Sequence, residues 1–486
     1  MTVDSSRIVL ATINARYYHS AFGLRCLLAN MGDLRSETGI LEFEGRVDVA
    51  EAVRLILART PEILGLGVYI WNVLKMTELI RLVREATPDI VIAVGGPEVS
   101  YSSHPVARLA DYTVCGEADT AFAELCAKIL TGTAPNRGVI KPPPPDLNTL
   151  KPPYYLYSEE DIACRVIYVE ASRSCPFHCE YCISALGNET RYFPVETWFT
   201  EMRKLLARGV RKFNFVDRTF NIHPSFYLPI LDFFHRNYCE GLELHLELAP
   251  MLFPDVLKES LSRFPSNALR LEVGVQTLNE EVNLRVGRHQ KASKTLDILN
   301  FIVNETEAHL HVDLIAGLPG ETLESIAFSF DRLVAIGANE IQFGILKRLP
   351  GALIDRHTEE WGMSYEKDPP YAIRESRLID KSMVRRLKRF ARYWEIVVNS
   401  GRFPRVTQRY ISSAQSPFSE FLCLSDWLYS EFERTGGIGL DDLARALFGY
   451  LTQEHHSVPE ETARLVCADY CADGLRRIPP FFQGLV

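Results

Sequence analysis

Three cysteines stand close together in the chain, at Cys175, Cys179 and Cys182. Their spacing is C-x-x-x-C-x-x-C, and three thiolates can bind three irons of a cubane iron–sulfur cluster, which normally takes four cysteine ligands. No fourth cysteine lies near them in the sequence. The remaining iron would be open to another molecule, which makes the triad a candidate catalytic centre rather than an electron carrier.

Other roles for these cysteines agree less well with the sequence. A structural zinc site takes four ligands, usually in paired C-x-x-C form, and His178 lies between two of the cysteines. Buried cysteine also serves as a small apolar residue. A disulfide is disfavoured because the residues after Met1 resemble no secretory signal, so we expect a cytoplasmic protein with reduced thiols. The spacing, Pro176 and Tyr181 favour the cluster.

The segment resembles the radical S-adenosylmethionine (SAM) enzymes, whose signature is three cysteines at this spacing with an aromatic residue directly before the third. Tyr181 is that residue here, and Phe177 lies between the first two cysteines. The resemblance implies a [4Fe-4S] cluster on Cys175, Cys179 and Cys182, SAM on the fourth iron, and Phe177 and Tyr181 beside these cofactors. In that family the reduced cluster cleaves SAM to a 5′-deoxyadenosyl radical.

The elements around the triad predict a barrel. From residue 166 onward, strand-like runs alternate with helical segments, and the first run ends just before the cysteines. Six such units suit a partial (β/α)6 barrel of the TIM type, in which functional residues gather at the C-terminal ends of the strands. The predicted strands are 166–170, 212–216, 243–248, 269–275, 309–315 and 340–346.

Polar residues close or follow these strands, where an apolar barrel wall has no need of them. Any one of them alone would be interpreted as a cap or a salt-bridge partner. Together they would form a ring at one mouth of the barrel, which a binding site explains better. The ring consists of Asp217, Glu247, Gln276, Arg288 and Asp313.

The same stretches resemble the radical SAM subgroup that includes the oxygen-independent coproporphyrinogen oxidases and the methylthiotransferases. The similar motifs are G-V-Q-T at 274–277 and G-L-P-G-E-T at 317–322. The resemblance implies SAM contacts from Glu247, Gln276, Arg288 and Asp313. Arg288 would bind the SAM carboxylate, because a guanidinium can hold a carboxylate with two hydrogen bonds. Asp217 stands where the family often has Gly-Gly-Glu and would replace it at the SAM amino group.

Strand and helix signals also alternate through residues 1–140, which predicts a doubly wound, Rossmann-like parallel sheet. In such sheets ligands bind outside the carboxyl ends of the strands, and glycines there let a ligand approach the backbone closely. The candidate binding residues at these strand ends are Asn14, Arg16, Tyr17, Tyr69, Trp71, Asn72, Gly95, Gly96, Pro97, Glu98, Gly116 and Glu117.

This set resembles the cobalamin-binding domain that precedes the barrel in cobalamin-dependent radical SAM enzymes. Those domains often have Gly-Gly-Pro after the fourth strand and Gly-Glu after the fifth, and the resemblance implies cobalamin contacts from these loops. The D-x-H-x-x-G motif, whose histidine ligates cobalt in methionine-synthase-type domains, does not occur. Tyr69 and Trp71 are therefore the candidates to cover the lower face of the cobalt.

Four consecutive prolines at 142–145 cannot continue a helix or a sheet interior and predict an extended linker. We expect an α/β protein with a cobalamin-binding domain at 1–140, a proline-rich linker at 141–160, the barrel at 161–352 and a mainly α-helical domain at 353–486. The alternation of elements fails after residue 351, and 374–399 is predicted to be one long helix. The last region resembles an uncharacterised tail found in one branch of this class.

Apolar residues make up 47% of the 486-residue chain and charged residues 24%, the usual balance of a soluble globular protein. The formal net charge of −9 disfavours a nucleic-acid partner. No apolar run reaches the length of a membrane span, so no membrane association is expected.

The combined resemblance implies a cobalamin-dependent radical SAM enzyme that transfers a methyl group from methylcobalamin to a substrate carbon radical, which the 5′-deoxyadenosyl radical generates. Two other enzyme functions stay open: cyclisation, rearrangement or oxidation with both cofactors, and radical SAM chemistry without cobalamin. An iron–sulfur sensor is disfavoured because it has no use for the polar ring. The expected partners are a small-molecule or peptide substrate and an external one-electron reductant such as flavodoxin or ferredoxin.

Overall fold

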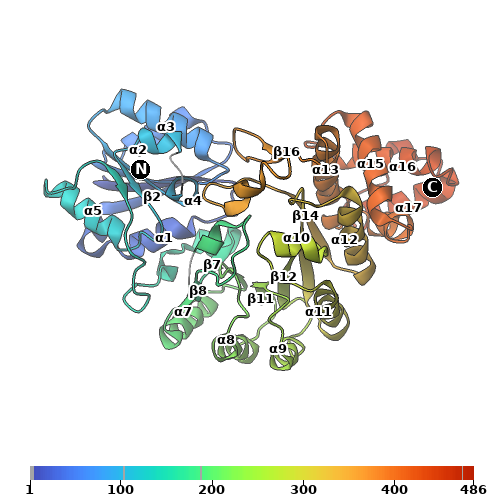
Figure 1. The fold of residues 1–486 in the computed structure, drawn as a ribbon, viewed down its shortest axis with the longest axis horizontal. Coiled ribbons are helices and arrows are strands. Elements are labelled where there is room, and N and C mark those ends of the chain that lie inside the picture. Colours follow the sequence, from blue (N-terminus) through green and yellow to red (C-terminus); the bar gives the residue numbers. More distant parts are fainter. Residues whose placement is uncertain (1–4, 102–103, 187–188, 473) are drawn as a thin grey trace.

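The computed structural model of the chain describes residues 5–101, 104–186, 189–472 and 474–486. Figure 1 shows an α/β domain that contains the N-terminus, a second α/β part in green and yellow, and a group of helices in red that leads to the C-terminus. The α/β prediction, with a doubly wound domain, a partial barrel and a helical C-terminal region, is confirmed.

The N-terminal sheet has six parallel strands in the order β2-β1-β3-β4-β5-β6. The switch of direction between β1 and β3 is where a doubly wound sheet opens a crevice for a ligand. All seven residues of β1 are buried, as expected for a strand covered on both faces. The strands are β1 (Ile8–Asn14), β2 (Thr38–Glu44), β3 (Ile63–Gly67), β4 (Val91–Gly95), β5 (Tyr112–Val114) and β6 (Gly138–Ile140).

Helices cover both faces of this sheet with separate apolar cores. One core includes residues of α2 and α3, and the other includes residues of α1 and α5. The sequence predicts strands in this domain only at 8–12, 63–68, 90–94 and 112–115. It does not predict β2 and β6, because β2 mixes glutamates with its apolar residues and β6 is only three residues long. The helices are α1 (Phe22–Ala29), α2 (Val49–Leu57), α3 (Val73–Ala86), α4 (Pro97–Ser100) and α5 (Ala121–Leu130).

The second sheet is the partial barrel, with six parallel strands in the sequential order β14-β13-β12-β11-β10-β7. Buried leucines and valines alternate along β12 with half-buried residues such as Glu272 and Gln276. The apolar positions belong to the main core of the protein, so the polar positions face the other side of the sheet. The strands are β7 (Ile167–Val169), β10 (Lys212–Phe215), β11 (Glu243–Leu248), β12 (Leu269–Gln276), β13 (His309–Ala316) and β14 (Glu340–Ile345).

Helices follow the barrel strands and cover the apolar face of the sheet (Figure 1). The short antiparallel strands β8 (Ser172–Arg173) and β9 (Arg191–Tyr192) flank the cysteine segment. The covering helices are α7 (Val195–Ala207), α8 (Pro224–Arg236), α9 (Asp255–Leu261), α10 (Glu280–Arg285), α11 (Ala292–Glu305) and α12 (Leu323–Ile336).

The C-terminal helices pack against the last part of the barrel. The ring of Phe390 lies 5.1 Å from that of Phe330 on α12 and 4.8 Å from that of Phe343 on β14, measured between centroids. Asn399 exchanges two hydrogen bonds with the backbone of Ile341, which covers part of the free edge of β14. The main helices are α13 (Lys381–Trp394), α15 (Pro417–Phe432), α16 (Leu440–Gln453) and α17 (Pro459–Tyr470).

The long helix predicted for 374–399 is shorter in the structure. Residues Ile373–Glu375 form strand β16, paired with β15 (Ser364–Tyr365), and α13 begins only after Asp380. The Asp380 side chain accepts a hydrogen bond from the backbone N–H of Met383, as a helix N-cap does. The last residues, Glu395–Asn399, form a π-helical turn.

The segment between β14 and α13 joins all three parts. It includes the 3-10 helix η5 (Leu353–His357) and the β15–β16 pair, and Figure 1 shows it in orange between the N-terminal domain and the C-terminal helices. Tyr371 donates a hydrogen bond to the buried carboxylate of Glu98 in α4. This contact ties the segment to the first domain.

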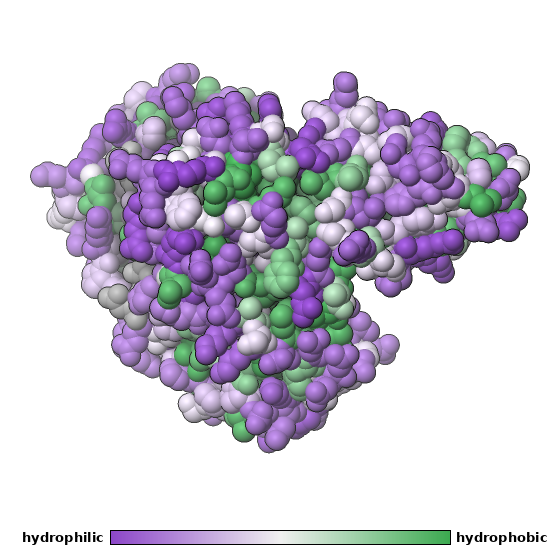
Figure 2. Space-filling model, turned by 45° about the vertical axis from the view of Figure 1, so that its right-hand side comes forward, coloured by the Kyte–Doolittle hydropathy of each residue, from purple (hydrophilic) through white to green (hydrophobic). Residues whose placement is uncertain are grey.

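Hydrophilic residues cover most of the face seen in Figure 2, and hydrophobic ones gather mainly in a band near its middle. Among the helices that the structure describes, none has the length and hydrophobicity that crossing a bilayer would require.

Candidate active site

A cavity of about 170 Å³ opens at the C-terminal ends of the barrel strands. All three signature cysteines line it, and no other cysteine does in the described part of the chain. The predicted ring residues that line it are Glu247, Gln276, Arg288 and Asp313, joined by Phe177 and Tyr181. The fold therefore brings most of the predicted site into one cavity.

The cysteine segment leaves β8 through a tight turn at Ser174, whose φ is +73°. The Cys175 sulfur lies 3.5 Å from the Thr219 hydroxyl oxygen, and burial raises the pKa of the Cys175 thiol. Burial disfavours a free thiolate, whereas bound iron would stabilise it, because metal binding deprotonates a coordinating thiol. The Cys175 thiol would therefore lose its proton on binding iron rather than beforehand.

Arg288 holds the cysteine segment against β12. Its guanidinium donates hydrogen bonds to the Cys179 sulfur at 3.5 Å and to the Tyr181 hydroxyl at 3.3 Å. It also donates to the Gly274 carbonyl and to the Gln290 side chain. These bonds occupy most of its five N–H groups. Arg288 therefore positions the cluster residues, besides being the candidate to bind the SAM carboxylate.

Glu180, between two signature residues, is fixed from outside the barrel. Its buried carboxylate pairs with His357 at 2.7 Å and also with Arg356. Its backbone carbonyl accepts a hydrogen bond from Ile354 N–H at 2.9 Å, and its own N–H donates to the Val286 carbonyl at 3.0 Å. The helix η5 thus braces the cysteine segment. This brace was not predicted from the sequence, because contacts so distant along the chain leave no local pattern.

The ring carboxylates are poised for a cationic ligand. Burial raises the pKa of Glu247 to about 7. Burial also raises the pKa of Asp313, whose carboxylate accepts a hydrogen bond from Gln342 at 2.9 Å. A positive charge in the cavity would favour the ionised form of both groups.

Gln276 has an unsatisfied side-chain oxygen. Its Oε1 is buried and has no hydrogen-bond partner among the residues that the structure describes. Its φ is +67°, at an irregularity in the pairing of β12 with β13. A buried acceptor without a partner is costly, so an external hydrogen-bond donor at this position would stabilise it.

Asp217 differs from the prediction, because it does not line the cavity. Its carboxylate accepts hydrogen bonds from the backbone N–H of Ala171 at 3.0 Å and from the Ser172 hydroxyl at 2.5 Å. Burial raises the pKa of Asp217 to about 7. This carboxylate connects the segment after β7 to the end of β10, which is a structural task.

A second cavity, of about 250 Å³, lies at the carboxyl ends of β3, β4 and β5 in the N-terminal domain. Five of the predicted loop residues line it, namely Tyr69, Gly95, Gly96, Gly116 and Glu117. No histidine lines it in the part of the chain that the structure describes. The cavity lies outside the carboxyl ends of the strands, where doubly wound sheets bind ligands.

Glycines shape this second cavity. Gly96 has φ +107°, and a Cβ there would lie 2.5 Å from the Val68 carbonyl oxygen. A Cβ at Gly65, inside β3, would lie 2.7 Å from the Phe122 ring. The sequence analysis missed Gly23, Gly65 and Gly67, which also line the cavity. The G-L-G run inside an apolar strand was the available signal, since glycine in a strand often marks a close approach.

The other predicted loop residues lie outside this cavity. Asn72 is buried and connects the ends of β1 and β3 through hydrogen bonds to Ile13 and Gly67 carbonyls. Trp71 stacks on Tyr69 with ring centroids 4.5 Å apart and is 55% exposed. The predicted residues that do not line the cavity are Asn14, Arg16, Tyr17, Trp71, Asn72, Pro97 and Glu98.

A short stretch of chain separates the two cavities. Glu170 and Arg173 line the cavity of the N-terminal domain, and Cys175 lines that of the barrel. Arg173 pairs with Glu170 at 2.6 Å, Glu117 at 2.9 Å and Asp119 at 2.7 Å. These buried pairs raise the pKa of the guanidinium further and fix the wall between the two cavities.

Three family models match the chain in succession. The B12 binding domain matches residues 8–126, and the radical SAM superfamily matches residues 169–333. The chain is a radical SAM enzyme with a B12-binding domain. Residues 359–483 of this radical SAM enzyme match a family described only as a protein of unknown function.

Two curated relatives of this radical SAM enzyme are methyltransferases by name. The 2-(S-pantetheinyl)-carbapenam-3-carboxylate methyltransferase of Streptantibioticus cattleyicolor is 25% identical over 369 residues, which span 64% of this chain and 51% of the relative. The cobalamin-dependent radical SAM methyltransferase TokK of Streptomyces tokunonensis is 25% identical, over 60% of this chain and 48% of the relative. The chain spans about half the length of both relatives.

Solved structures share the fold of this radical SAM enzyme. The cobalamin-dependent SAM radical enzyme OxsB superposes with a TM-score of 0.64 at 10% identity, over 96% of this chain and 79% of that one. The radical SAM methyltransferase TsrM from Kitasatospora setae gives 0.60 at 18% identity, over 77% of this chain and 82% of that one.

The domains of this radical SAM enzyme take a [4Fe-4S] cluster, SAM and cobalamin, and the side chains present fit them. The three cysteines share one cavity, as a cluster with an open iron needs. The free Gln276 oxygen and the ring carboxylates offer acceptors for SAM. The glycine-lined cavity of the N-terminal domain gives cobalamin close access to backbone.

Proposed function

We propose that the protein is a cobalamin-dependent methyltransferase that methylates a carbon atom of its substrate by radical chemistry. When bound, the cobalamin would supply the methyl group, and the cluster with SAM would supply the radical that activates the substrate. The names of the two curated relatives, both methyltransferases, support this proposal.

The proximity of the two cavities is the observation that carries the proposal. Glu170 and Arg173 line one cavity and Cys175 the other, so only four residues separate Glu170 of the first site from the first cysteine of the second. A methyl donor held in the first cavity and a substrate activated in the second would then lie close to one wall. Methyl transfer requires such proximity, because the reacting atoms must approach closely in a fixed orientation.

The chain's own residues would bind and orient the reactants. Arg288 fixes Cys179 and Tyr181 and would contact the SAM carboxylate. Glu247 and Asp313 would pair with the positive charges of SAM, and Gln276 would accept a hydrogen bond from it. The Arg173 ion pairs would keep the wall between the sites rigid and limit the entry of water.

The partners follow from this chemistry. A radical SAM enzyme needs a substrate and a source of electrons. A flavodoxin or ferredoxin is the proposed one-electron donor, and a small molecule or a peptide is the proposed substrate class. Eleven cysteines, none in a disulfide, agree with a reducing cytoplasm as the proposed location.

An isotope experiment tests the proposal. The anaerobically reconstituted enzyme receives SAM with a trideuterated methyl group, a reductant and a metabolite extract from its source cells. A product that carries the labelled methyl group, and that is absent from the Cys182→Ala reaction, supports methyl transfer. An unlabelled isomer or a product that has lost hydrogen would contradict it and assign cyclisation, rearrangement or oxidation instead.

A further inference from the structure

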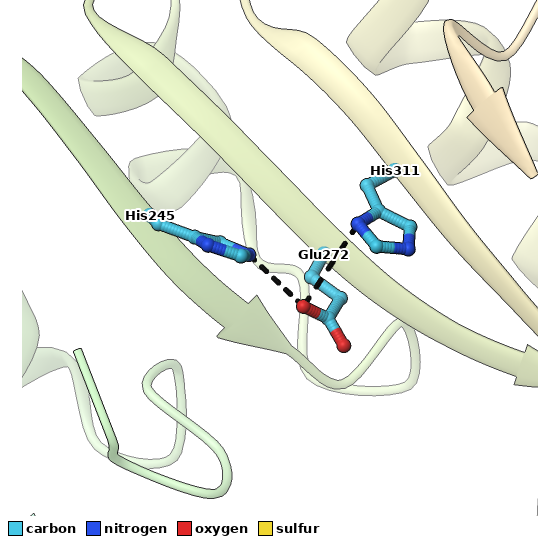
Figure 3. A group of neighbouring side chains, drawn as sticks. All are labelled: His245, Glu272 and His311. Atoms are coloured by element: carbon cyan, nitrogen blue, oxygen red, sulfur yellow. Dashed lines mark hydrogen bonds and ion pairs between the residues drawn. The ribbon is translucent and has the colours of Figure 1, made fainter. Parts of the chain in front are cut away.

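Two histidines and a glutamate converge inside the partial barrel. His245 on β11, Glu272 on β12 and His311 on β13 come from three neighbouring strands, and Figure 3 shows their side chains pointing toward one another. The His245 Nε2 atom lies 2.9 Å from the Glu272 Oε2 atom, and the His311 Nδ1 atom lies 4.0 Å from the same oxygen. The three ligand atoms all lie within 4.8 Å of one another.

A simple hydrogen bond explains only part of this cluster. His245 and Glu272 satisfy each other, but His311 is only 5% exposed and its Nδ1 has no hydrogen-bond partner in the described part of the chain. The other ring nitrogen of His311 lies 3.4 Å from the Asp313 carboxylate. A carboxylate beside one ring nitrogen is the usual support for a histidine that binds a metal through the other. The unpartnered Nδ1 therefore points to a missing ligand between the three side chains.

The local charge also favours a cation. Glu272 lines the same barrel cavity as Glu247 and Asp313, so three carboxylates meet in a mostly buried space. Arg218 lies 4.0 Å from Glu247 and pairs with that carboxylate. Among the described residues it forms no ion pair with Glu272 or Asp313. Buried charges need a partner or a metal ion. SAM would neutralise the carboxylates near the carboxyl ends of the strands. Glu272 lies further from the carboxyl end of β12 than Gln276 does.

We propose that His245 Nε2, the Glu272 carboxylate and His311 Nδ1 bind one divalent first-row transition-metal ion. Two imidazoles and one carboxylate suit zinc or ferrous iron, whereas magnesium and calcium prefer oxygen ligands alone. Ligand atoms about 2.0–2.1 Å from a tetrahedral zinc are roughly 3.4 Å apart, which lies within the spread of separations seen here. Three protein ligands leave a fourth position open to the barrel cavity. This site is separate from the cysteine cluster and does not depend on the proposed methyl transfer.

Zinc binding to the full-length, cluster-reconstituted protein tests the site, because zinc is not a component of the cluster. Equilibrium dialysis against Zn²⁺, with metal analysis of zinc and iron, gives the stoichiometry and Kd. The variants are His245→Ala, His311→Ala and Glu272→Gln, the last of which keeps its shape and its hydrogen bond to His245. His455→Ala is the matched control, because His455 pairs with Glu420 at 2.7 Å without a third ligand group among the described residues.

The site predicts one zinc per chain in the wild-type protein and in the His455→Ala control. Each of the three site variants should raise the Kd for zinc at least about tenfold. Even the loss of a residue that only hydrogen-bonds to a metal ligand lowers the affinity by about this factor. Anomalous scattering at the zinc edge should place the ion between the three side chains. Zinc binding that is absent from folded wild-type protein, or equally strong in the Glu272→Gln variant, would overturn the proposal. Unchanged thermal unfolding of Glu272→Gln separates lost binding from lost folding.

Discussion

Replacing Gly96 with alanine tests whether the loop after β4 forms the cobalamin site. Gly96 has φ +107° and ψ 168°, a conformation that only glycine adopts readily. A residue with a side chain would lose about 1–3 kcal/mol there. The new Cβ would also lie 2.5 Å from the Val68 carbonyl oxygen, which is backbone and cannot rotate away. Such overpacking costs roughly another 1–3 kcal/mol.

The free energy of unfolding of the Gly96→Ala variant should therefore fall by about 2–6 kcal/mol. Relief of the clash requires Gly96 to move away from the end of β3, and Gly96 lines the cavity. We expect hydroxocobalamin to bind at least about tenfold more weakly. A tenfold loss of affinity corresponds to about 1.4 kcal/mol, so only part of this strain has to act against binding. Urea unfolding followed by circular dichroism, and equilibrium dialysis with hydroxocobalamin, measure the two effects.

Gly132→Ala is the matched control in the same domain. Gly132 has φ +70°, a Cβ there would meet no atom within 4 Å, and the residue does not line the cavity. Its replacement should cost about 1–2 kcal/mol of stability and leave the cobalamin Kd unchanged. Wild-type cobalamin affinity in the Gly96→Ala variant, or equal weakening in both variants, would refute the assignment of this loop.

Three further predictions concern the barrel mouth. The apparent affinity for SAM should fall about tenfold from pH 8 to pH 6, because burial raises the pKa of Glu247 to about 7 and protonation removes its attraction for a cation. The Glu247→Gln variant should flatten the profile of Kd against pH. A pH dependence that is unchanged in this variant would exclude Glu247 as its cause. His357→Ala should speed the loss of iron to a chelator, because the buried bond to Glu180 contributes about 1.5–3 kcal/mol to the stability of the cysteine segment. His357→Gln, which keeps a hydrogen-bond donor, should slow the loss again. Wild-type rates of iron loss in both variants would argue against the brace. Cys182→Ala should abolish cluster assembly and SAM cleavage, so 5′-deoxyadenosine formation by this variant would rule out the cluster assignment.

The cysteine motif and the strand-end rule made much of the barrel site predictable. Glu247, Gln276 and Asp313 lie on parallel strands whose carboxyl ends meet at one edge, so their convergence follows once the strands are located. Gly95, Gly96 and Gly116 of the N-terminal cavity were predictable in the same way, because loops at the carboxyl ends of parallel strands lie together.

Residues that hold the backbone were harder to distinguish from residues that face a ligand. Asp217, Asn72 and Glu98 stand at strand ends like true lining residues, but their side chains form hydrogen bonds with backbone or side-chain groups within the protein. The sequence does not reveal which partner a polar side chain meets. The brace on Glu180 escaped prediction for the same reason, since His357 lies far away along the chain.

The products of SAM test the central claim most directly. The reconstituted enzyme is incubated with reductant and SAM, with and without hydroxocobalamin, and S-adenosylhomocysteine and 5′-deoxyadenosine are quantified. Two uses of SAM predict both products, with S-adenosylhomocysteine formed only when cobalamin is present and 5′-deoxyadenosine lost in the cysteine variants. Formation of 5′-deoxyadenosine alone, at the same rate with and without cobalamin, would contradict a cobalamin-dependent methyl transfer.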